Sequence, residues 1–518
     1  MGEQLLKISH LSKSFGGIQA LKDVSLDIDE AQIHCFAGIN GSGKSTLIKC
    51  VSGVYQPDEG NICIRGREFS SLMPQQAIAE GIQVIYQDLS LFKHLTIAEN
   101  IAINRIMNQK SGLVHQRDIY RIAQEQMEKI NVKLDLSATI QESTMATCQL
   151  TAICRALAMD ARIIFMDEPT TALTQHEVRN LMSIVNKLKQ KGYAIVFISH
   201  KLDEVFDIAD KIIEFRDGEI VGNFSRNELD PKKLAQYMTG RDIEYSRYKR
   251  TCTNTDKVLK ISHLSQTDHY TDISLDIRPG DIVGLSGLLG SGRTELALTL
   301  FGLNGFTHGE IEFLGKKIKR VTPSLMRKLG LGLLPEDRAS QGLFVERSIR
   351  ENLSAVTLED CCKRRGIMDR GKEQTLAEKL VETMRIKTDS IEATTSMLSG
   401  GNQQKVAIGK WIASQPKLFI MDSPTVGIDV GSKAEIYERI QEYASNGMAI
   451  LLISDEVEEL VLNCNRIFVL AQGKLISVID EEEREATPPE QLEAKISHLI
   501  SIGNTNHGTQ EARPHENA

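Results

Sequence analysis

The sequence repeats its own opening. Leu6–Ser12 reads LKISHLS, and the same seven letters return at Leu259–Ser265. Further pairs follow in the same order: VSLDI with ISLDI, GINGSGKST with GLLGSGRTE, and IIFMDEPTTAL with LFIMDSPTVGI. The members of these pairs lie 249 to 255 residues apart. Ordered matches at nearly constant spacing indicate an internal repeat, so the chain is predicted to be a tandem duplication of one fold.

The length of the chain agrees with two domains. At 518 residues it exceeds the roughly 250–300 residues at which a single hydrophobic core stops growing. Residues 1–240 are predicted to form the first domain and residues 258–500 the second, with residues 241–257 as a short polar linker. Residues 501–518 are polar, and we expect them to form a disordered tail.

Short apolar runs alternate with helix-like segments. Consecutive apolar residues dominate Ile163–Met166, Ile195–Ile198 and Ile212–Phe215, a pattern that is typical of strands buried on both faces of a parallel sheet. Glu177–Gln190 carries apolar residues at helical spacing and is predicted to be a helix between two of these strands. The sequence therefore predicts an α/β fold for each copy.

Composition excludes several classes of protein. Lys and Arg number 61 and Asp and Glu number 69, which gives a formal net charge of −8. An acidic chain is a poor candidate for general nucleic-acid binding, so no nucleic-acid partner is expected. No apolar run approaches the roughly 20 residues of a membrane span, and the first residues lack the pattern of a secretory signal. Nine cysteines without a CxxC pair are typical of reduced thiols, and we expect a cytosolic protein.

A phosphate-binding loop is predicted in the first copy. Gly38–Ser45 fits the pattern GxxxxGK[ST], follows the apolar run Ile33–Ala37 and precedes the helix-like run Thr46–Val51. In such a loop the backbone N–H groups surround phosphate oxygens, Lys44 reaches the β- and γ-phosphates, and the Ser45 hydroxyl holds Mg²⁺. We therefore expect a nucleotide to bind through Gly38, Asn40, Gly41, Ser42, Gly43, Lys44, Ser45 and Thr46.

Two carboxylates end one of the predicted buried strands. Asp167 and Glu168 close an apolar run, where charged groups need a cation or a water network. Asp167 suits a ligand of Mg²⁺, and Glu168 suits a base that polarises the attacking water. Two solvated residues at a strand end are the simpler alternative, but the phosphate-binding loop upstream favours the catalytic interpretation. His200 ends the next strand, and its position favours contact with the γ-phosphate or the water.

A second anion-binding turn is predicted in the other copy. Leu398–Gln404 reads LSGGNQQ and precedes the helix-like run Lys405–Trp411. A Ser-Gly-Gly turn at a helix start presents backbone N–H groups to an anion. A plain helix cap would explain the serine alone, but not the two glycines and two glutamines that follow. The candidate residues of this turn are Ser399, Gly400, Gly401 and Gln403.

Together these motifs resemble those of the ATP-binding-cassette ATPases. GLLGSGRTE, PEDR (Pro335–Arg338) and LSGGNQQKVAIGKW are similar to the second half of the tandem-cassette ATPases of bacterial carbohydrate importers, the ribose, galactose and xylose type. The similarity extends over about Leu5–Asp480. It implies two tandem P-loop cassettes, each with a core parallel sheet and a helical subdomain.

The resemblance also assigns further roles. It implies that Phe15 stacks on adenine, and that Gln87 contacts Mg²⁺ and transmits to the permease. It implies that LSGGNQQ is the family's signature, and that the cassettes clasp head to tail around ATP. Site one would then join the P-loop of cassette one to the signature of cassette two, and site two would join the reverse pair.

The two copies depart from the family pattern unequally. Cassette one keeps its catalytic positions, but its own signature reads STMATCQL and lacks both glycines. In cassette two, Lys44, Gln87, Glu168 and His200 are replaced by Arg293, Glu336, Ser423 and Asp455, respectively. The resemblance therefore implies one complete site and one degenerate site. The second P-loop would bind nucleotide at most, through Gly287, Gly290, Ser291, Gly292, Arg293 and Thr294.

The function predicted from these features is ATP hydrolysis that energises import of a sugar or related small polar solute. The resemblance implies ATP and Mg²⁺ as cofactors, two membrane permease subunits as partners, and indirectly an extracytoplasmic solute-binding protein. The protein would then lie at the cytoplasmic face of the cell membrane. One alternative is a soluble tandem-cassette ATPase that acts on ribosomes or nucleic acid, which the short linker and acidic charge disfavour. Another is a non-hydrolysing scaffold, which the complete first site disfavours.

Overall fold

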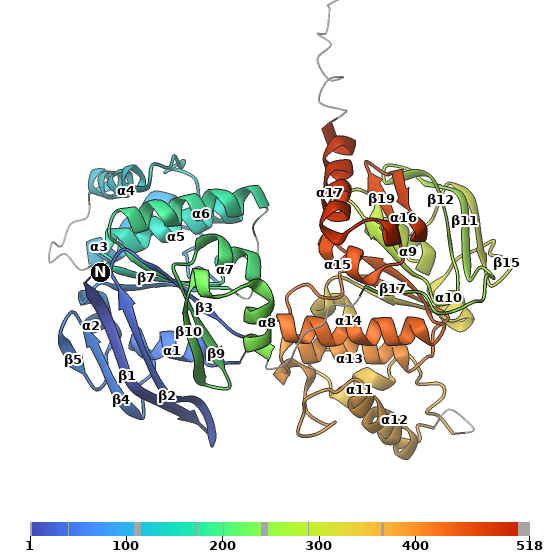
Figure 1. Cartoon of the computed structure of the whole chain (residues 1–518), viewed down its shortest axis with the longest axis horizontal. Helices are drawn as coiled ribbons and strands as arrows, with labels where there is room; N and C mark the ends of the chain where they lie inside the picture. Colours follow the sequence, from blue (N-terminus) through green and yellow to red (C-terminus); the bar gives the residue numbers. More distant parts are fainter. Residues whose placement is uncertain are drawn as a thin grey trace, which may run out of the picture. The chain divides into compact units, whose positions relative to one another are not determined.

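The computed structural model divides the chain into two compact units, with the boundary between residues 243 and 244 (Figure 1). Each unit contains one copy of the repeat, with two sheets and a set of helices. The structure describes residues 3–39, 41–107, 115–170, 173, 175–199, 201–239, 247–288, 290–363 and 367–505.

The first unit contains an antiparallel sheet and a mostly parallel one. The antiparallel sheet has the order β2-β1-β4-β5, and the other has the order β10-β9-β3-β8-β7-β6 with only β10 antiparallel to its neighbour. Every residue of β3 and β8 is buried, which confirms the prediction of strands covered on both faces. The strands are β1 Gln4–Phe15, β2 Ile18–Asp29, β3 Ile33–Ala37, β4 Glu59–Ile64, β5 Arg67–Phe69, β6 Ile82–Ile85, β7 Ile163–Asp167, β8 Ala194–Ile198, β9 Lys211–Arg216 and β10 Glu219–Ser225.

Helices surround these sheets. α3, α4 and α5 pack on one another as a helical layer, seen together at the upper left of Figure 1. The helix predicted at Glu177–Gln190 is confirmed as α6, which begins two residues earlier. The helices of the unit are α1 Lys44–Val51, α2 Pro74–Ala79, α3 Ile97–Met107, α4 Gln116–Ile130, α5 Met145–Ala158, α6 Gln175–Gln190, α7 Leu202–Ile208 and α8 Pro231–Thr239.

The second unit repeats this architecture. Its sheets have the orders β12-β11-β14-β15 and β16-β17-β18-β13-β19-β20, and β13, β17 and β18 are buried along their whole length. The strands are β11 Leu259–Gln266, β12 Tyr270–Ile277, β13 Ile282–Ser286, β14 His308–Phe313, β15 Lys316–Lys317, β16 Leu331–Leu334, β17 Leu418–Asp422, β18 Ala449–Ile453, β19 Arg466–Ala471 and β20 Lys474–Ile479. The duplication predicted from the sequence is thus present as two copies of one α/β fold.

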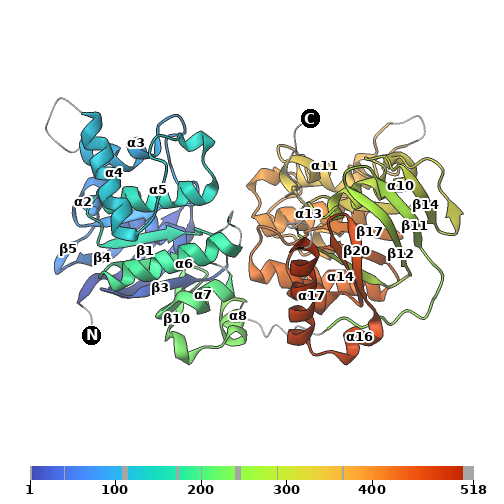
Figure 2. The ribbon, with the colours of Figure 1, turned by 90° about the horizontal axis from the view of Figure 1, so that it is seen from above.

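The helices of the second unit include one that extends past the predicted domain end. α17, labelled in Figure 1 and Figure 2, packs against α15 and β19 and continues to Thr505, five residues into the segment expected to be a disordered tail. The helices are α9 Arg293–Phe301, α10 Pro323–Leu329, α11 Ile349–Ser354, α12 Arg370–Thr383, α13 Gly400–Ile412, α14 Val430–Ser445, α15 Val457–Asn463, α16 Glu481–Ala486 and α17 Pro489–Thr505.

The described part of the predicted linker also differs from the expectation. Tyr248 is buried in the second unit, where its hydroxyl donates to the Gly280 carbonyl at 2.7 Å. The Arg484 guanidinium donates to the Tyr248 carbonyl at 2.6 Å. An ion pair joins Arg250 to Asp281 at 3.2 Å. The segment from residue 247 onward is therefore part of the second unit, because its aromatic ring and backbone oxygen are satisfied there.

Candidate functional site

A glycine turn connects β3 to α1 in the first unit. Gly38, Gly41 and Gly43 have φ angles of 145°, 82° and 103°, which side chains other than glycine rarely adopt. A Cβ atom at Gly38 would lie 2.3 Å from the Phe215 carbonyl oxygen. The glycines predicted to form the phosphate-binding loop are therefore required by the backbone path, and α1 begins at the lysine that follows.

The Lys44 side chain lies inside this turn. Its ammonium donates to the carbonyl oxygens of Gly38 at 2.7 Å and Ile39 at 2.9 Å, and to the Ser42 hydroxyl at 3.1 Å. All three of these acceptors are neutral, while the nearby carboxylates of Glu214, Glu168 and Asp167 favour the charged form of the lysine. Burial lowers the pKa of Lys44. A buried cation held by neutral oxygens at a helix start fits a phosphate group as its charge partner.

The carboxylates predicted at the end of β7 lie beside this lysine. Asp167 ends the strand and Glu168 follows with a φ of 46°. The Gln87 side-chain amide donates to the Glu168 carboxylate at 3.4 Å. Burial raises the pKa of Asp167, while the nearby Lys44 lowers it. The structure thus brings together four of the predicted catalytic and metal-binding residues.

The remaining predictions for the first unit have mixed outcomes. Ser45 and Thr46 lie in the first turn of α1, as the P-loop pattern requires. Phe15 ends β1, is 42% exposed, and has its ring centroid 5.1 Å from that of Tyr55 in an edge-on arrangement. Its accessible ring suits stacking on a base. Asn40 and His200 lie outside the described residues.

The predicted anion-binding turn of the second unit starts α13. Ser399 caps this helix, and Gly400 and Gly401 are its first two residues. The Gln403 side-chain amide donates to the carbonyl oxygens of Thr395 at 3.3 Å and Leu398 at 3.2 Å. These bonds fix the glutamine against the loop before the helix. The N–H groups of the first turn are therefore held at an ordered helix start, as an anion site requires.

The P-loop of the second unit has the same backbone but a different charge partner. Gly287, Gly290 and Gly292 repeat the positive φ angles, at 155°, 80° and 94°. Arg293, however, forms an ion pair with Asp455 and donates to the Ser454 carbonyl at 3.1 Å. The cation that replaces Lys44 is thus already paired with a carboxylate.

The two units match a known family model. The model of the ABC transporter family matches residues 21–171 and 270–426, one segment in each copy of the repeat. The chain belongs to the ABC transporter family. Each unit is therefore an ATP-binding cassette, and the chain is an ATPase of the type that is coupled to transport.

Relatives resemble the chain over nearly its whole length. A putative ribose/galactose/methyl galactoside import ATP-binding protein of Pseudomonas syringae pv. tomato is 38% identical over 96% of this chain and 93% of that protein. The ribose import ATP-binding protein RbsA 2 of Streptomyces avermitilis is 38% identical over 92% of this chain and 95% of its own. A solved ATP-binding cassette in its ADP conformation is 24% identical over 45% of this chain and 94% of that chain, with a TM-score of 0.41.

One buried acid near the P-loop of cassette one was missed by the sequence patterns. Glu214 lies on β9 opposite Ala37 of β3 and is fully buried. Neither of its carboxylate oxygens has a hydrogen-bond partner among the described residues. Burial raises the pKa of Glu214 from 4.5 to about 8, although the positive charge of Lys44 lowers it. The only signal was a glutamate inside the apolar run Ile212–Phe215.

This acid makes cassette one sensitive to alkaline pH. The folded protein retains a proton on Glu214 that the unfolded chain releases above pH 4.5. The contribution of Glu214 to the free energy of unfolding therefore falls as the pH rises toward 8. The free energy of unfolding of Glu214→Gln minus that of the parent is expected to be about 2 kcal/mol larger at pH 8 than at pH 6. Urea unfolding of the full chain at both pH values measures this difference. The exposed Glu219→Gln is the control, and an equal gain at both pH values would contradict the shifted pKa.

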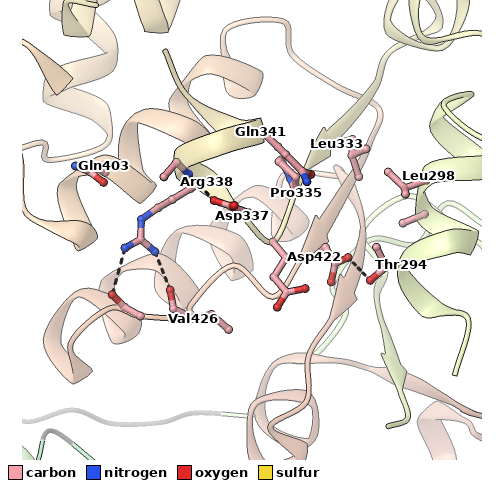
Figure 3. A pocket seen from close by; sticks show the side chains of 14 residues that line it. Thr294, Leu298, Leu333, Pro335, Asp337, Arg338, Gln341, Gln403, Asp422 and Val426 are labelled. Carbon is pink, nitrogen blue, oxygen red and sulfur yellow. Dashed lines mark hydrogen bonds between the residues drawn. The ribbon is translucent and has the colours of Figure 1, made fainter. Parts of the chain in front are cut away.

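Cassette two contains a cavity of about 510 Å³ beside its P-loop (Figure 3). Thr294 and Asp422 lie at one side of it, joined by a hydrogen bond of 2.7 Å. Glu336, which replaces the glutamine of cassette one, also lines the cavity, and so do Arg338 and Gln403. The cavity thus touches the P-loop helix, the segment after β16 and the signature helix α13 of the same cassette.

Proposed function

We propose that this protein hydrolyses ATP to energise import of a sugar or related small polar solute, and that only site one is catalytically complete. The observation that carries the asymmetry is the contrast between the two P-loop cations. The hydrogen-bond acceptors of Lys44 in the P-loop are neutral oxygens, whereas Arg293 forms an ion pair with Asp455. The import of sugars is inferred from the printed names of the relatives.

Site one would combine groups of cassette one with the signature of cassette two. Phe15 would stack on adenine and Lys44 would hold the β- and γ-phosphates. Glu168 would polarise the attacking water, and its hydrogen bond from Gln87 fixes the orientation of the carboxylate. His200, which follows β8 in the sequence, would contact the γ-phosphate or that water. The head-to-tail pairing that completes this site comes from the family resemblance.

The residues around the P-loop fit Mg²⁺. Ser45, Gln87 and Asp167 offer hydroxyl, amide and carboxylate oxygens, the ligand types that this ion prefers. When bound, Mg²⁺ would supply neutralisation of phosphate charge. The protein's own contribution is the rigid placement of Asp167 at the end of a buried strand.

Site two keeps Thr294 and Asp422 at the positions of Ser45 and Asp167, but it lacks the free lysine and the catalytic carboxylate. A phosphate would have to compete with Asp455 for Arg293, and Ser423 offers no carboxylate to polarise water. Its signature would be the start of α5, where Met145 and Ala146 stand at the positions of the two glycines. We therefore propose that site two binds nucleotide at most.

The solute would pass through other chains. No helix in the part of the chain that the structure describes is long and apolar enough to cross a membrane. The relatives are named import ATP-binding proteins, which supports two permease subunits as partners, an extracytoplasmic solute-binding protein as an indirect partner, and a position at the cytoplasmic membrane face.

The transport assignment can be tested by co-purification. The tagged full chain, isolated from detergent-solubilised membranes of its own cells, is expected to bring down membrane-spanning chains in stoichiometric amount. Mass spectrometry identifies them, and solute uptake is expected to fail when the chain is deleted. The untagged strain is the control. Recovery of ribosomes or nucleic acid in place of membrane chains would contradict the proposal and favour the soluble alternative.

A further inference from the structure

One arginine joins three separate segments of cassette two. Arg338 ends the PEDR run that follows β16, and its guanidinium extends to the loop between β17 and α14 (Figure 3). There it donates to the carbonyl oxygens of Val426 at 2.8 Å and Gly427 at 3.4 Å. Two hydrogen bonds from one planar group fix both the position and the orientation of that loop.

The same guanidinium lies against the signature. A Cβ atom at Gly400 would be 2.8 Å from the Arg338 Nη2 atom and 3.1 Å from the Gly427 carbonyl oxygen. A side chain at Gly400 would therefore displace the Arg338 guanidinium from this position. Gly400 is the first residue of α13, directly after the capping Ser399. The Arg338 guanidinium thus lies between the beginning of the signature helix and the loop that follows β17, and its hydrogen bonds go to that loop.

Cassette one provides an internal comparison. When the sequence after β6 is aligned with the sequence after β16, Leu89 falls at the position of Arg338. When α5 is aligned with α13, Met145 falls at the position of Gly400. Cassette one therefore lacks both members of the contact. It is also the cassette whose signature has lost its glycines.

A second link is shared by both cassettes. Arg155 of α5 donates to the carbonyl oxygens of Leu89 at 2.7 Å and Ser90 at 2.8 Å. At the matching position of α13, Lys410 donates to the Gly342 carbonyl. Each cassette thus ties this helix to the segment after β6 or β16. The arginine contact is an addition that accompanies the intact signature.

We propose that Arg338 is a positioning residue that holds the signature of cassette two in the geometry needed for hydrolysis in site one. This inference rests on the proposed function, in which that signature closes on ATP bound by cassette one. Loss of Arg338 would release the start of α13 and the loop at Val426 together. It would leave untouched the residues of cassette one that bind nucleotide, so turnover and nucleotide binding should respond differently.

The test uses the full chain with its permease partners. Arg338→Leu introduces the residue that cassette one carries and is expected to lower kcat for ATP at least tenfold. The dissociation constant for ADP, measured by fluorescence titration, is expected to stay within twofold of the parental value. The melting temperature of the variant is expected to equal that of the parent within experimental error. Arg338→Lys keeps the charge and one donor and is expected to restore part of kcat. The control is Arg347→Ala, since that side chain is 69% exposed and contacts Glu351 at 3.8 Å.

Several results would overturn the inference. A kcat within twofold of the parent for Arg338→Leu would show that the contact is dispensable. A weaker affinity for ADP or a lower melting temperature in parallel with kcat would indicate a general structural role. A lysine variant no better than the leucine variant would contradict a role for the charged donor. Lys44→Ala in the same assay tests the proposed function separately, because it must stop turnover whatever Arg338 does.

Discussion

Lys44→Ala is expected to lower phosphate release by the full chain at least about 100-fold, the scale of losing one well-placed charged donor at a developing negative charge. The reason is structural: the Lys44 ammonium is buried in the P-loop of cassette one and has only neutral acceptors there. Steady-state phosphate release at saturating ATP, with the permease partners present, measures the loss.

The matched variant in cassette two is Arg293→Ala. It is expected to retain most of the parental rate, because Arg293 is engaged by Asp455 and the Ser454 carbonyl. Alanine at the equivalent P-loop position of each cassette thus distinguishes the contributions of the two sites to hydrolysis. Equal losses from the two variants would contradict the assignment of hydrolysis to site one.

Glu168→Gln is the second change with a large expected effect. It should preserve ATP binding but reduce turnover by about 10²–10⁴, the usual contribution of a general base. The amide keeps the shape of the side chain and can still contact Gln87, yet it does not polarise water as a carboxylate does. Single-turnover phosphate release and equilibrium ATP binding, measured on the same preparation, distinguish the two effects.

Ser423→Glu provides the companion to this variant. It restores a carboxylate at the matching position of cassette two, but Arg293, Glu336 and Asp455 remain. Since hydrolysis requires charge neutralisation and water activation together, the restored carboxylate is expected to leave the Glu168→Gln protein inactive. Ser423→Glu alone should keep the parental rate, which shows that the cassette still folds. Recovery of the double variant to near the parental rate would exclude the asymmetric mechanism.

The sequence predicted the duplication, the buried strands and both P-loops because each depends on short, local patterns. It did not predict the pairing of Arg293 with Asp455, although both substitutions were recognised. Arg293 follows β13 and Asp455 follows β18, and only the pairing of these two strands in the sheet brings their ends together. Glu214 was missed for the same reason, because β9 reaches the P-loop of cassette one only through its pairing with β3.

The segment predicted as a linker illustrates a different limit of sequence patterns. The segment around Tyr248 is polar in composition, so it was interpreted as linker. The Tyr248 ring is nevertheless buried, and its hydroxyl donates to the Gly280 carbonyl. A single anchoring side chain does not alter a composition average, but it is sufficient to attach a segment to a domain.

Attachment of that segment to cassette two leaves a short connection between the two cassettes. Only residues 240–246 separate the end of α8 from Arg247. If the cassettes pair head to tail as proposed, a connection this short makes their association an intramolecular event, with an effective concentration on the order of millimolar. Pairing is then insensitive to how much protein the cell makes, and two first cassettes have little chance to pair with each other. Every chain would carry one productive site and one silent site in fixed stoichiometry.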